Sequence, residues 1–197
     1  MKFAIACKSD GFWHILDEVR GTDAYIRIQS PADLDVGRLE SHGIETVFFA
    51  HWSWIVPEDI LSRFECVCFH SAPVPFGRGG SPIQNMIALG REETEIVALR
   101  MQRTLDSGPV YMRERCSLLG GGEEVMIRIY RRIGDMSAVM CQAMPEAVPQ
   151  EGPVTIFRRR TPEESRIPQD STLPALFDHI RMLDIEGYPS AFLDHGR

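Results

Sequence analysis

The 197-residue sequence contains no long apolar run. None reaches the roughly 18 to 20 residues that a membrane-spanning helix needs. The amino-terminal segment becomes polar at Lys8, before the apolar core of a signal peptide would develop. We therefore expect a cytoplasmic protein with no membrane partner.

Positive charge is also scarce. The chain has 21 Lys and Arg residues against 28 Asp and Glu, which gives a formal net charge of −7. Proteins that hold nucleic acid mainly through its phosphates are usually basic, so this balance argues against a nucleic-acid partner and leaves only a local basic patch open. With 44% apolar residues, the chain is able to bury a core of its own.

Cysteines are few, scattered and odd in number, at five. This favours reduced thiols over a disulfide framework. Cys66, Cys68 and His70 alternate as C-x-C-x-H along one expected strand. Alternate side chains of a strand share a face but stand too far apart to surround one ion, so we predict no metal site.

Short apolar runs alternate with amphipathic or polar stretches over the first seventy residues. This alternation is typical of βαβ units on a parallel sheet. We expect strands at 3–7, 24–28, 45–50 and 65–69. We expect helices at 11–19, at 31–41 with Ser30 as its cap, and at 57–64.

Beyond residue 70 a loop rich in proline and glycine runs to Ser81. We expect a helix at 82–89, strands at 95–102 and 109–116, and a helix that follows the glycines at 120–122. The predicted fold class is α/β, with one Rossmann-like, mostly parallel sheet and helices on both faces. We place the domain at 1–144 and treat 145–197 as an extension, with a helix at 173–183, packed on the same domain.

Two segments follow strands of the predicted sheet at the edge where ligands of parallel sheets bind. The first is His51-Trp52-Ser53-Trp54-Ile55, and the second begins at His70. The two tryptophans either cap the core or form the wall of a pocket for a flat ring. Likewise, His70 is either a base that works at neutral pH or a histidine held in place for structure.

The segment 68–84, CFHSAPVPFGRGGSPIQ, resembles a family signature. The signature is N-x-H-x-S-L-L-P-x-x-R-G-x-x-P-x-Q, found in the formyltetrahydrofolate-dependent formyltransferases. Residues that match it without a gap are His70, Pro75, Arg78, Gly79, Pro82 and Gln84. The segment 105–108, LDSG, is similar to the family's L-D-T-G and places Asp106 at the expected separation from His70. Both residues follow expected strands, and we expect the carboxyl ends of these strands to open on one crevice, with His70 and Asp106 within hydrogen-bonding reach. The segment 50–57, AHWSWIVP, is similar to V-A-Y-G-x-I-L-P.

This resemblance implies an N-formyltransferase with a core like that of methionyl-tRNA formyltransferase and N10-formyltetrahydrofolate as the formyl donor. It makes His70 the base and Asp106 the carboxylate that orients it. The loop from His51 to Ile55 would receive the pterin, and Arg78 and Gly79 would belong to the donor site.

The sequence departs from the family at Cys68. The family has an asparagine there, which donates a hydrogen bond to the developing oxyanion, whereas a thiol is a weak donor. We expect another group to donate the hydrogen bond to the oxyanion. We count Cys68 among the catalytic residues because it occupies the position of the family's donor. If nothing compensates, the protein would bind a folate or a nucleotide without turnover.

The segments 159–165 and 177–192 resemble the tail of formyltransferases that act on amino sugars. This resemblance favours a nucleotide-linked amino sugar as the acceptor. A second copy of the chain, in a homodimer, is the other partner that we consider. The tRNA branch of the family carries a further carboxy-terminal domain, whereas only five residues follow Phe192 here. Arg78 and the three arginines at 158–160 could bind phosphate groups of the acceptor. For the cluster at 158–160, the alternative is a solvent-exposed strand edge. A hydrolase that releases formate with the same His/Asp pair is the alternative.

Overall fold

The computed structural model describes residues 2–20 and 25–194. Its strands are β1 (Phe3–Ala6), β2 (Ile26–Ile28), β3 (Thr46–Phe49), β4 (Glu65–His70), β5 (Arg78–Gly79), β6 (Glu93–Arg100), β7 (Val110–Ser117) and β8 (Ile156–Phe157). Its α-helices are α1 (Asp10–Arg20), α2 (Val36–Ser41), α3 (Glu58–Arg63), α4 (Pro82–Ala88), α5 (Gly122–Gln142) and α6 (Leu173–Arg181). Short 3₁₀ turns lie at Pro31–Asp33 and Pro162–Ser165.

Six strands form the central sheet, in the order β2-β1-β3-β4-β6-β7. The pairings β1–β2, β1–β3 and β3–β4 are parallel, as expected for βαβ units. β6 runs antiparallel to both β4 and β7. The sheet is therefore mostly parallel, with an antiparallel hairpin at one edge that has a direct consequence for the site.

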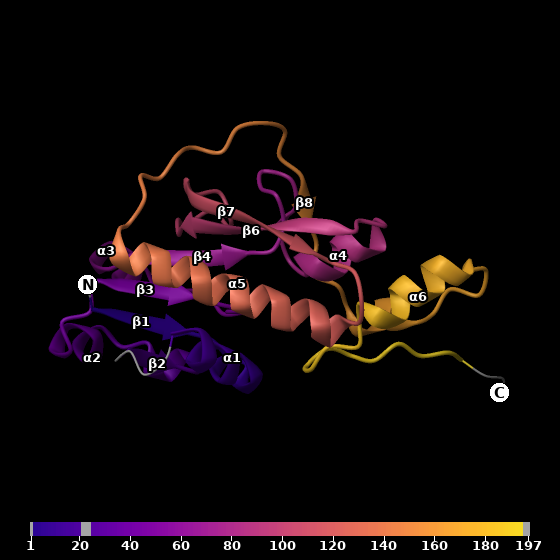
Figure 1. The fold of residues 1–197 in the computed structure, drawn as a ribbon, viewed down its shortest axis with the longest axis horizontal. Coiled ribbons are helices and arrows are strands. Elements are labelled where there is room, and N and C mark those ends of the chain that lie inside the picture. Colours follow the sequence, from indigo (N-terminus) through magenta and orange to yellow (C-terminus); the bar gives the residue numbers. More distant parts are fainter. Residues whose placement is uncertain (1, 21–24, 195–197) are drawn as a thin grey trace.

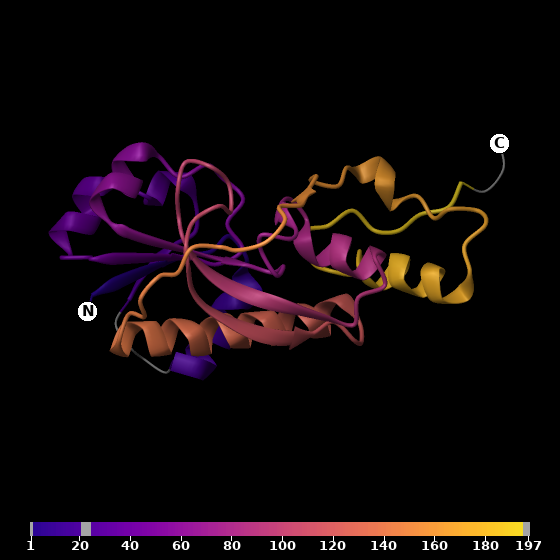
Figure 2. The same ribbon diagram turned by 90° about the horizontal axis from the view of Figure 1, so that it is seen from above.

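Helices cover both faces of the sheet, which confirms the α/β class (Figures 1 and 2). On one face, α1 and α5 pack over a core that includes Phe48, Val67 and Ile129. On the other face, α2 and α3 pack over a separate core that includes Phe49 and Cys66. Because side chains alternate along a strand, each buried strand supplies apolar residues to both cores.

Most predicted elements are present within a few residues of their expected ends, but the helix expected at 31–41 is not continuous. It is a 3₁₀ turn followed by α2, with Leu34 outside helical geometry between them. The side chain of Asp35, rather than Ser30, caps α2 by accepting a hydrogen bond of 2.7 Å from the Arg38 amide. The strand expected at 24–28 begins at Ile26, and residue 24 lies outside the described residues.

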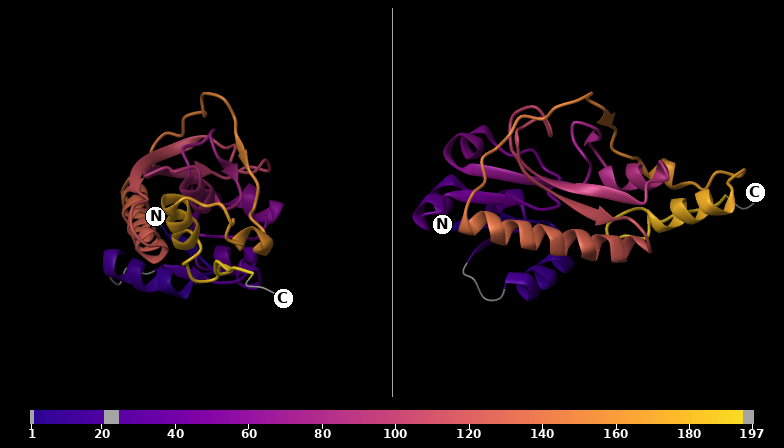
Figure 3. Two further views of the ribbon diagram at one scale, coloured as in Figure 1. Left: turned by 90° about the vertical axis from the view of Figure 1, so that its right-hand side faces the viewer. Right: turned by 45° about the horizontal axis from the view of Figure 1, so that its top comes forward.

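The segment after α5 crosses the edge of the sheet and then continues beyond it. It arches over β6 and β7, pairs through β8 with β5, and leads to α6, which projects past the end of the sheet beside α4 (Figures 1 and 3). α5 is the longest helix described, and none of the described helices is both long and apolar enough to span a membrane. The arching segment, residues 143–155 between α5 and β8, thus reaches the loops that follow β4 and β6.

Candidate active site

A cavity of about 930 Å³ opens at the carboxyl ends of β3 and β4. All five residues predicted from the first loop line it, namely His51, Trp52, Ser53, Trp54 and Ile55. Cys68, His70, Gly79 and Asp106 line it as well. The structure therefore brings two segments that follow neighbouring strands, and a third from beyond β6, around one space.

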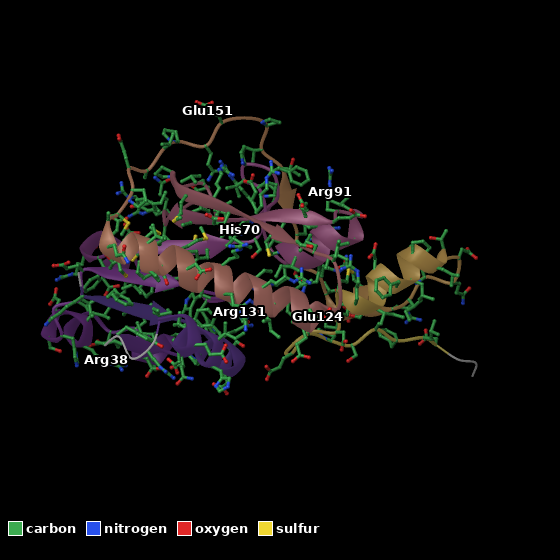
Figure 4. The ribbon with its side chains drawn as sticks, in the orientation of Figure 1. Arg38, His70, Arg91, Glu124, Arg131 and Glu151 are labelled. Carbon is green, nitrogen blue, oxygen red and sulfur yellow. The ribbon has the colours of Figure 1, made fainter. Side chains whose placement is uncertain are left out.

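His70 and Asp106 form a buried pair at this cavity, with His70 near the centre of the molecule in Figure 4. The distance from His70 Nδ1 to Asp106 Oδ2 is 3.5 Å, and the two side chains are only 7% and 11% exposed. The amide of Gly79 donates a hydrogen bond of 2.9 Å to the same Oδ2. The proximity predicted from the sequence is confirmed, and the pair is shielded from water, which strengthens its electrostatic interaction.

Asp106 reaches His70 by a route that the sequence prediction had wrong. We expected both residues at the carboxyl ends of strands that open on one crevice. β6 is antiparallel to β4, so its carboxyl end lies opposite the first half of β4, with Arg100 paired to Val67. The loop after β6 then folds back along the sheet, and Asp106 takes the left-handed conformation (φ 51°) there.

Both ring nitrogens of His70 face oxygen acceptors. Nδ1 faces the carboxylate of Asp106, and Nε2 lies 2.7 Å from the carbonyl oxygen of Gly77. A doubly protonated ring donates to both oxygens, whereas a neutral ring donates to only one. To act as a base with Nε2, His70 must therefore release Gly77. Asp106 Oδ1, by contrast, has no hydrogen-bond partner among the described residues.

Cys68 lies on the same face of β4 as His70 and packs against the apolar side chains of that face. Burial, together with the nearby charge of Asp106, raises the pKa of the thiol far above its usual value. The group is therefore a neutral thiol at physiological pH, which disfavours a nucleophilic role. Within residues 2–20 and 25–194, no group of His, Cys, Asp or Glu side chains is arranged to hold a metal ion.

Replacement of Cys68 by asparagine tests its position. We expect Cys68→Asn to preserve or raise kcat for the formyl transfer that the resemblance implies. The side-chain amide is a stronger hydrogen-bond donor than the thiol, and it would lie next to the His70–Asp106 pair. Steady-state kinetics with circular dichroism as the folding control measures this. A loss of kcat in a folded Cys68→Asn protein would show that the thiol itself is required.

The aromatic loop forms the outer wall of the cavity. The rings of Trp52 and Trp54 meet edge to face, with centroids 4.8 Å apart, and Trp52 also contacts Phe49. The Trp52 indole N–H is buried and has no hydrogen-bond partner within residues 2–20 and 25–194. A buried donor without a partner is costly, so this wall suits a flat ligand that carries an acceptor atom. The tryptophans do both things that the sequence allowed: Trp52 packs on the core and both rings line the cavity.

His51 takes a left-handed backbone conformation (φ 49°) at the start of this loop. Burial, and then the positive charges of Lys8 and Arg159, lower its pKa from 6.5 to about 4. His51 is therefore neutral at physiological pH. Its ring meets Tyr130 edge to face, with centroids 6.3 Å apart.

This shift predicts a pH dependence of stability. Between pH 7 and pH 5 the unfolded chain protonates His51 while the folded chain does not, so His51 lowers the free energy of unfolding as the pH falls. The contribution is about 2 kcal/mol over that range. His51→Asn, which keeps a residue tolerant of the left-handed conformation, should remove it. Urea unfolding of both proteins at the two pH values measures the difference, and an unchanged pH dependence would contradict it.

Arg78 is the predicted donor-site residue that lies apart from the others. It does not line the cavity, and its guanidinium instead donates to Gln150 Oε1 from Nε at 3.1 Å and from Nη2 at 2.8 Å. The contact with Gln150 holds this side chain outside the cavity lining, and a contact of Arg78 with the donor stays a prediction. Gly79 does line the cavity, and it contributes its backbone amide.

The wall opposite the tryptophans was not predicted. It is formed by Met126, Ile129, Tyr130 and Ile133 of α5, together with Tyr188. The apolar periodicity of α5 indicated only a core-facing helix, so it gave no sign of a ligand wall. Of the arginine cluster, Arg159 lines the cavity, whereas Arg160 donates to the carbonyl of Glu164.

A family model described as the C-terminal domain of methionyl-tRNA formyltransferase matches residues 162–197. Among solved structures, that of methionyl-tRNA formyltransferase from Clostridium thermocellum has 36% sequence identity to this chain and a TM-score of 0.94. That alignment covers 100% of this chain and 88% of the other.

Two further relatives differ in how much they resemble the chain. Methionyl-tRNA formyltransferase from Methylobacterium sp. (strain 4-46) is 30% identical over 80% of this chain and 54% of its own length. The chain thus spans about half the length of this relative. A sugar N-formyltransferase from Shewanella sp. is 15% identical, with a TM-score of 0.66, over 98% of this chain and 92% of the other. At that identity, the likeness extends to the fold alone.

Proposed function

The chain belongs to the formyltetrahydrofolate-dependent formyltransferase family, and on that premise we propose that it transfers the formyl group of N10-formyltetrahydrofolate to a primary amine. The observation that carries the proposal is the buried His70–Asp106 pair at the cavity, with the Gly79 amide on the same carboxylate. Residues 1–144 would supply this pair, and 145–197 would complete the cavity from the same domain.

The reaction needs a group that takes up a proton. The acceptor amine attacks the formyl carbon, a tetrahedral intermediate forms, and its collapse breaks the bond to N10 of the folate. The amine loses one proton, which finally resides on N10. The His70–Asp106 pair would hold that proton in transit, through Asp106 Oδ1 or through His70 once Nε2 leaves Gly77. A positioned acid or base of this kind contributes about 10²- to 10⁴-fold to the rate.

The aromatic wall would receive the pterin of the donor. Trp52 and Trp54 offer faces for stacking, and the Trp52 N–H offers a donor that no described residue of the protein accepts from. A cavity of about 930 Å³ is within the usual range for ligands of this size. The acceptor would then approach from the α5 side.

For the acceptor, the sequence analysis favours an amino sugar from the tail, but the family model that matches this tail, at residues 162–197, is that of the C-terminal domain of methionyl-tRNA formyltransferase. The α5 wall also favours an apolar group. Met126, Ile129 and Ile133 offer no hydrogen bond to a sugar hydroxyl, but they suit an apolar side chain such as that of a methionyl group. The two relatives with 36% and 30% identity are named methionyl-tRNA formyltransferases. We therefore place a methionyl acceptor first and a nucleotide-linked amino sugar second.

Both acceptors carry phosphate, and Arg159 is the cavity cation best placed to meet it. Arg159 is exposed and forms no ion pair with a carboxylate among the described residues. We expect Arg159→Ala to raise KM for the acceptor about 10- to 100-fold while KM for the donor stays unchanged. Arg158→Ala is the matched control, since Arg158 is exposed but does not line the cavity. Equal effects of the two changes would contradict a role for Arg159.

The deciding assay supplies N10-formyltetrahydrofolate with methionyl-tRNA, with nucleotide-linked amino sugars, or with no amine. Formylated product with one acceptor supports the proposal and names the acceptor. Formate release without an amine identifies a hydrolase. A rise in melting temperature with reduced folate but no product in any arm identifies a binding protein without turnover.

A further inference from the structure

The side-chain amide of Gln150 connects the two loops that carry the candidate site. Its Nε2 donates hydrogen bonds of 2.9 Å to the carbonyl oxygen of Asp106 and 2.7 Å to that of Gly108. Its Oε1 accepts from the Arg78 guanidinium, at 3.1 Å and 2.8 Å. One amide thus uses both of its N–H groups and its oxygen between the loop after β4 and the loop after β6.

The orientation of this amide is fixed by its partners. Arg78 only donates hydrogen bonds, so the amide oxygen must face it, and the NH₂ group must then face the two carbonyls. The backbone on either side of Gln150 is also held in place. Val148 exchanges two hydrogen bonds with Val110, and Thr155 accepts from the amides of Gly77 and Arg78. Gln150 therefore lies on a segment anchored at both ends.

The loop that carries Asp106 is closed by hydrogen bonds from the Ser107 amide and hydroxyl to the carbonyl oxygen of Thr104, and Gln150 adds support from outside the loop. The loop lies outside the sheet, and Asp106 holds a positive φ of 51°, which is unfavourable for a residue with a side chain. This conformation aims the carboxylate at His70 and at the Gly79 amide. The hydrogen bonds from Gln150 fix the backbone on both sides of Ser107 in that geometry.

We propose that Gln150 is a positioning residue for the candidate reaction: it holds Asp106 against His70 without touching the substrates. The inference rests on the proposed function for its kinetic consequence. Gln150 itself does not line the cavity, so any effect on the reaction must pass through the residues it binds. Arg78, which the family signature includes, is then the residue that orients Gln150.

The first test compares Gln150→Leu with Glu151→Leu. Glu151 is the next residue of the same segment, is exposed, and points outward at the top of Figure 4. We expect Gln150→Leu to lower kcat about 10- to 100-fold with KM for the donor unchanged, because small displacements of a catalytic group have effects of that size. Glu151→Leu should leave kcat unchanged. Unchanged kcat in Gln150→Leu would overturn the proposal.

The variant Gln150→Glu separates the two halves of the network. It keeps an acceptor for Arg78 but turns carboxylate oxygens toward the carbonyls of Asp106 and Gly108. We expect it to lower kcat as much as Gln150→Leu does. Full activity of Gln150→Glu would show that the contact with Arg78 is sufficient, and it would refute the positioning of Asp106.

A double-mutant cycle distinguishes positioning from a general loss of structure. If Gln150 acts through Asp106, then Gln150→Leu should cause no further loss of kcat in the Asp106→Asn protein. Multiplicative losses would mean that Gln150 acts elsewhere, and this would overturn the inference.

A readout without turnover separates this inference from the proposed function. In the NMR spectrum of the full chain, we expect Gln150→Leu to shift the ring resonances of His70, as Asp106→Asn does, and Glu151→Leu to leave them in place. If these shifts occur and the wild-type protein transfers no formyl group, the positioning holds and the proposed function fails. If the protein is active and the His70 resonances do not move in Gln150→Leu, the positioning fails.

Discussion

His70→Ala and Asp106→Asn should each lower kcat for formyl transfer by about 10²- to 10⁴-fold. His70→Ala removes one member of the buried pair, and Asp106→Asn replaces the carboxylate by an amide of the same size. In both variants the cavity lacks the intact His70–Asp106 pair that would take up the proton of the acceptor amine. Steady-state kinetics with N10-formyltetrahydrofolate and the acceptor identified in the deciding assay measure the effect.

The fold should persist in both variants, because neither side chain belongs to an apolar core cluster. Circular dichroism and thermal unfolding check this. His14→Ala and Asp135→Asn are the matched controls, since both residues are exposed on helices and neither lines the cavity. Full formyl-transfer activity in the His70→Ala protein would refute the role of His70 in the reaction.

Gly79→Ala should reduce both stability and activity. Gly79 has a φ of 106°, and a Cβ placed there would lie 2.3 Å from the carbonyl oxygen of Phe157. The backbone of β8 would have to move, and the Gly79 amide would leave the carboxylate of Asp106. Strained backbone and overpacking together cost about 3 kcal/mol. We expect a loss of that size in urea unfolding and a kcat lowered at least 10-fold.

Gly90→Ala isolates the effect of the close approach. Gly90 also has a positive φ, of 68°, but a Cβ there would meet nothing within 4 Å. It should therefore cost only about 1 kcal/mol and leave kcat unchanged. Equal destabilisation by the two substitutions would show that the contact between β5 and β8 contributes nothing.

Local sequence determined much of the fold. The alternation of apolar runs and amphipathic stretches, with period 2 in strands and 3.6 in helices, predicts the order of elements because burial on both sheet faces requires it. It fails where a local polar interaction competes. At 31–41 the Asp35 side chain offers its own cap, so one expected helix becomes a 3₁₀ turn and a short α-helix.

The candidate site was predicted in part for the same reason. His70 ends a strand, and the aromatic loop from His51 to Ile55 follows another, so local position alone placed them at one edge of a parallel sheet. The separation between His70 and Asp106 was recognised from the family pattern. That pattern predicted their proximity but not the fold-back that produces it.

Only the tertiary structure decided which groups meet across long separations. Gln150 lies in a segment whose sequence, PEAVPQEGP, carries no periodic signal, and it acquires a role only because the chain after α5 returns over β7. Arg78 turns toward Gln150 rather than the cavity for the same reason. The acceptor wall on α5 has the pattern of an ordinary core face. Local sequence encodes burial through periodicity, whereas the contacts between distant loops depend on how the whole chain packs.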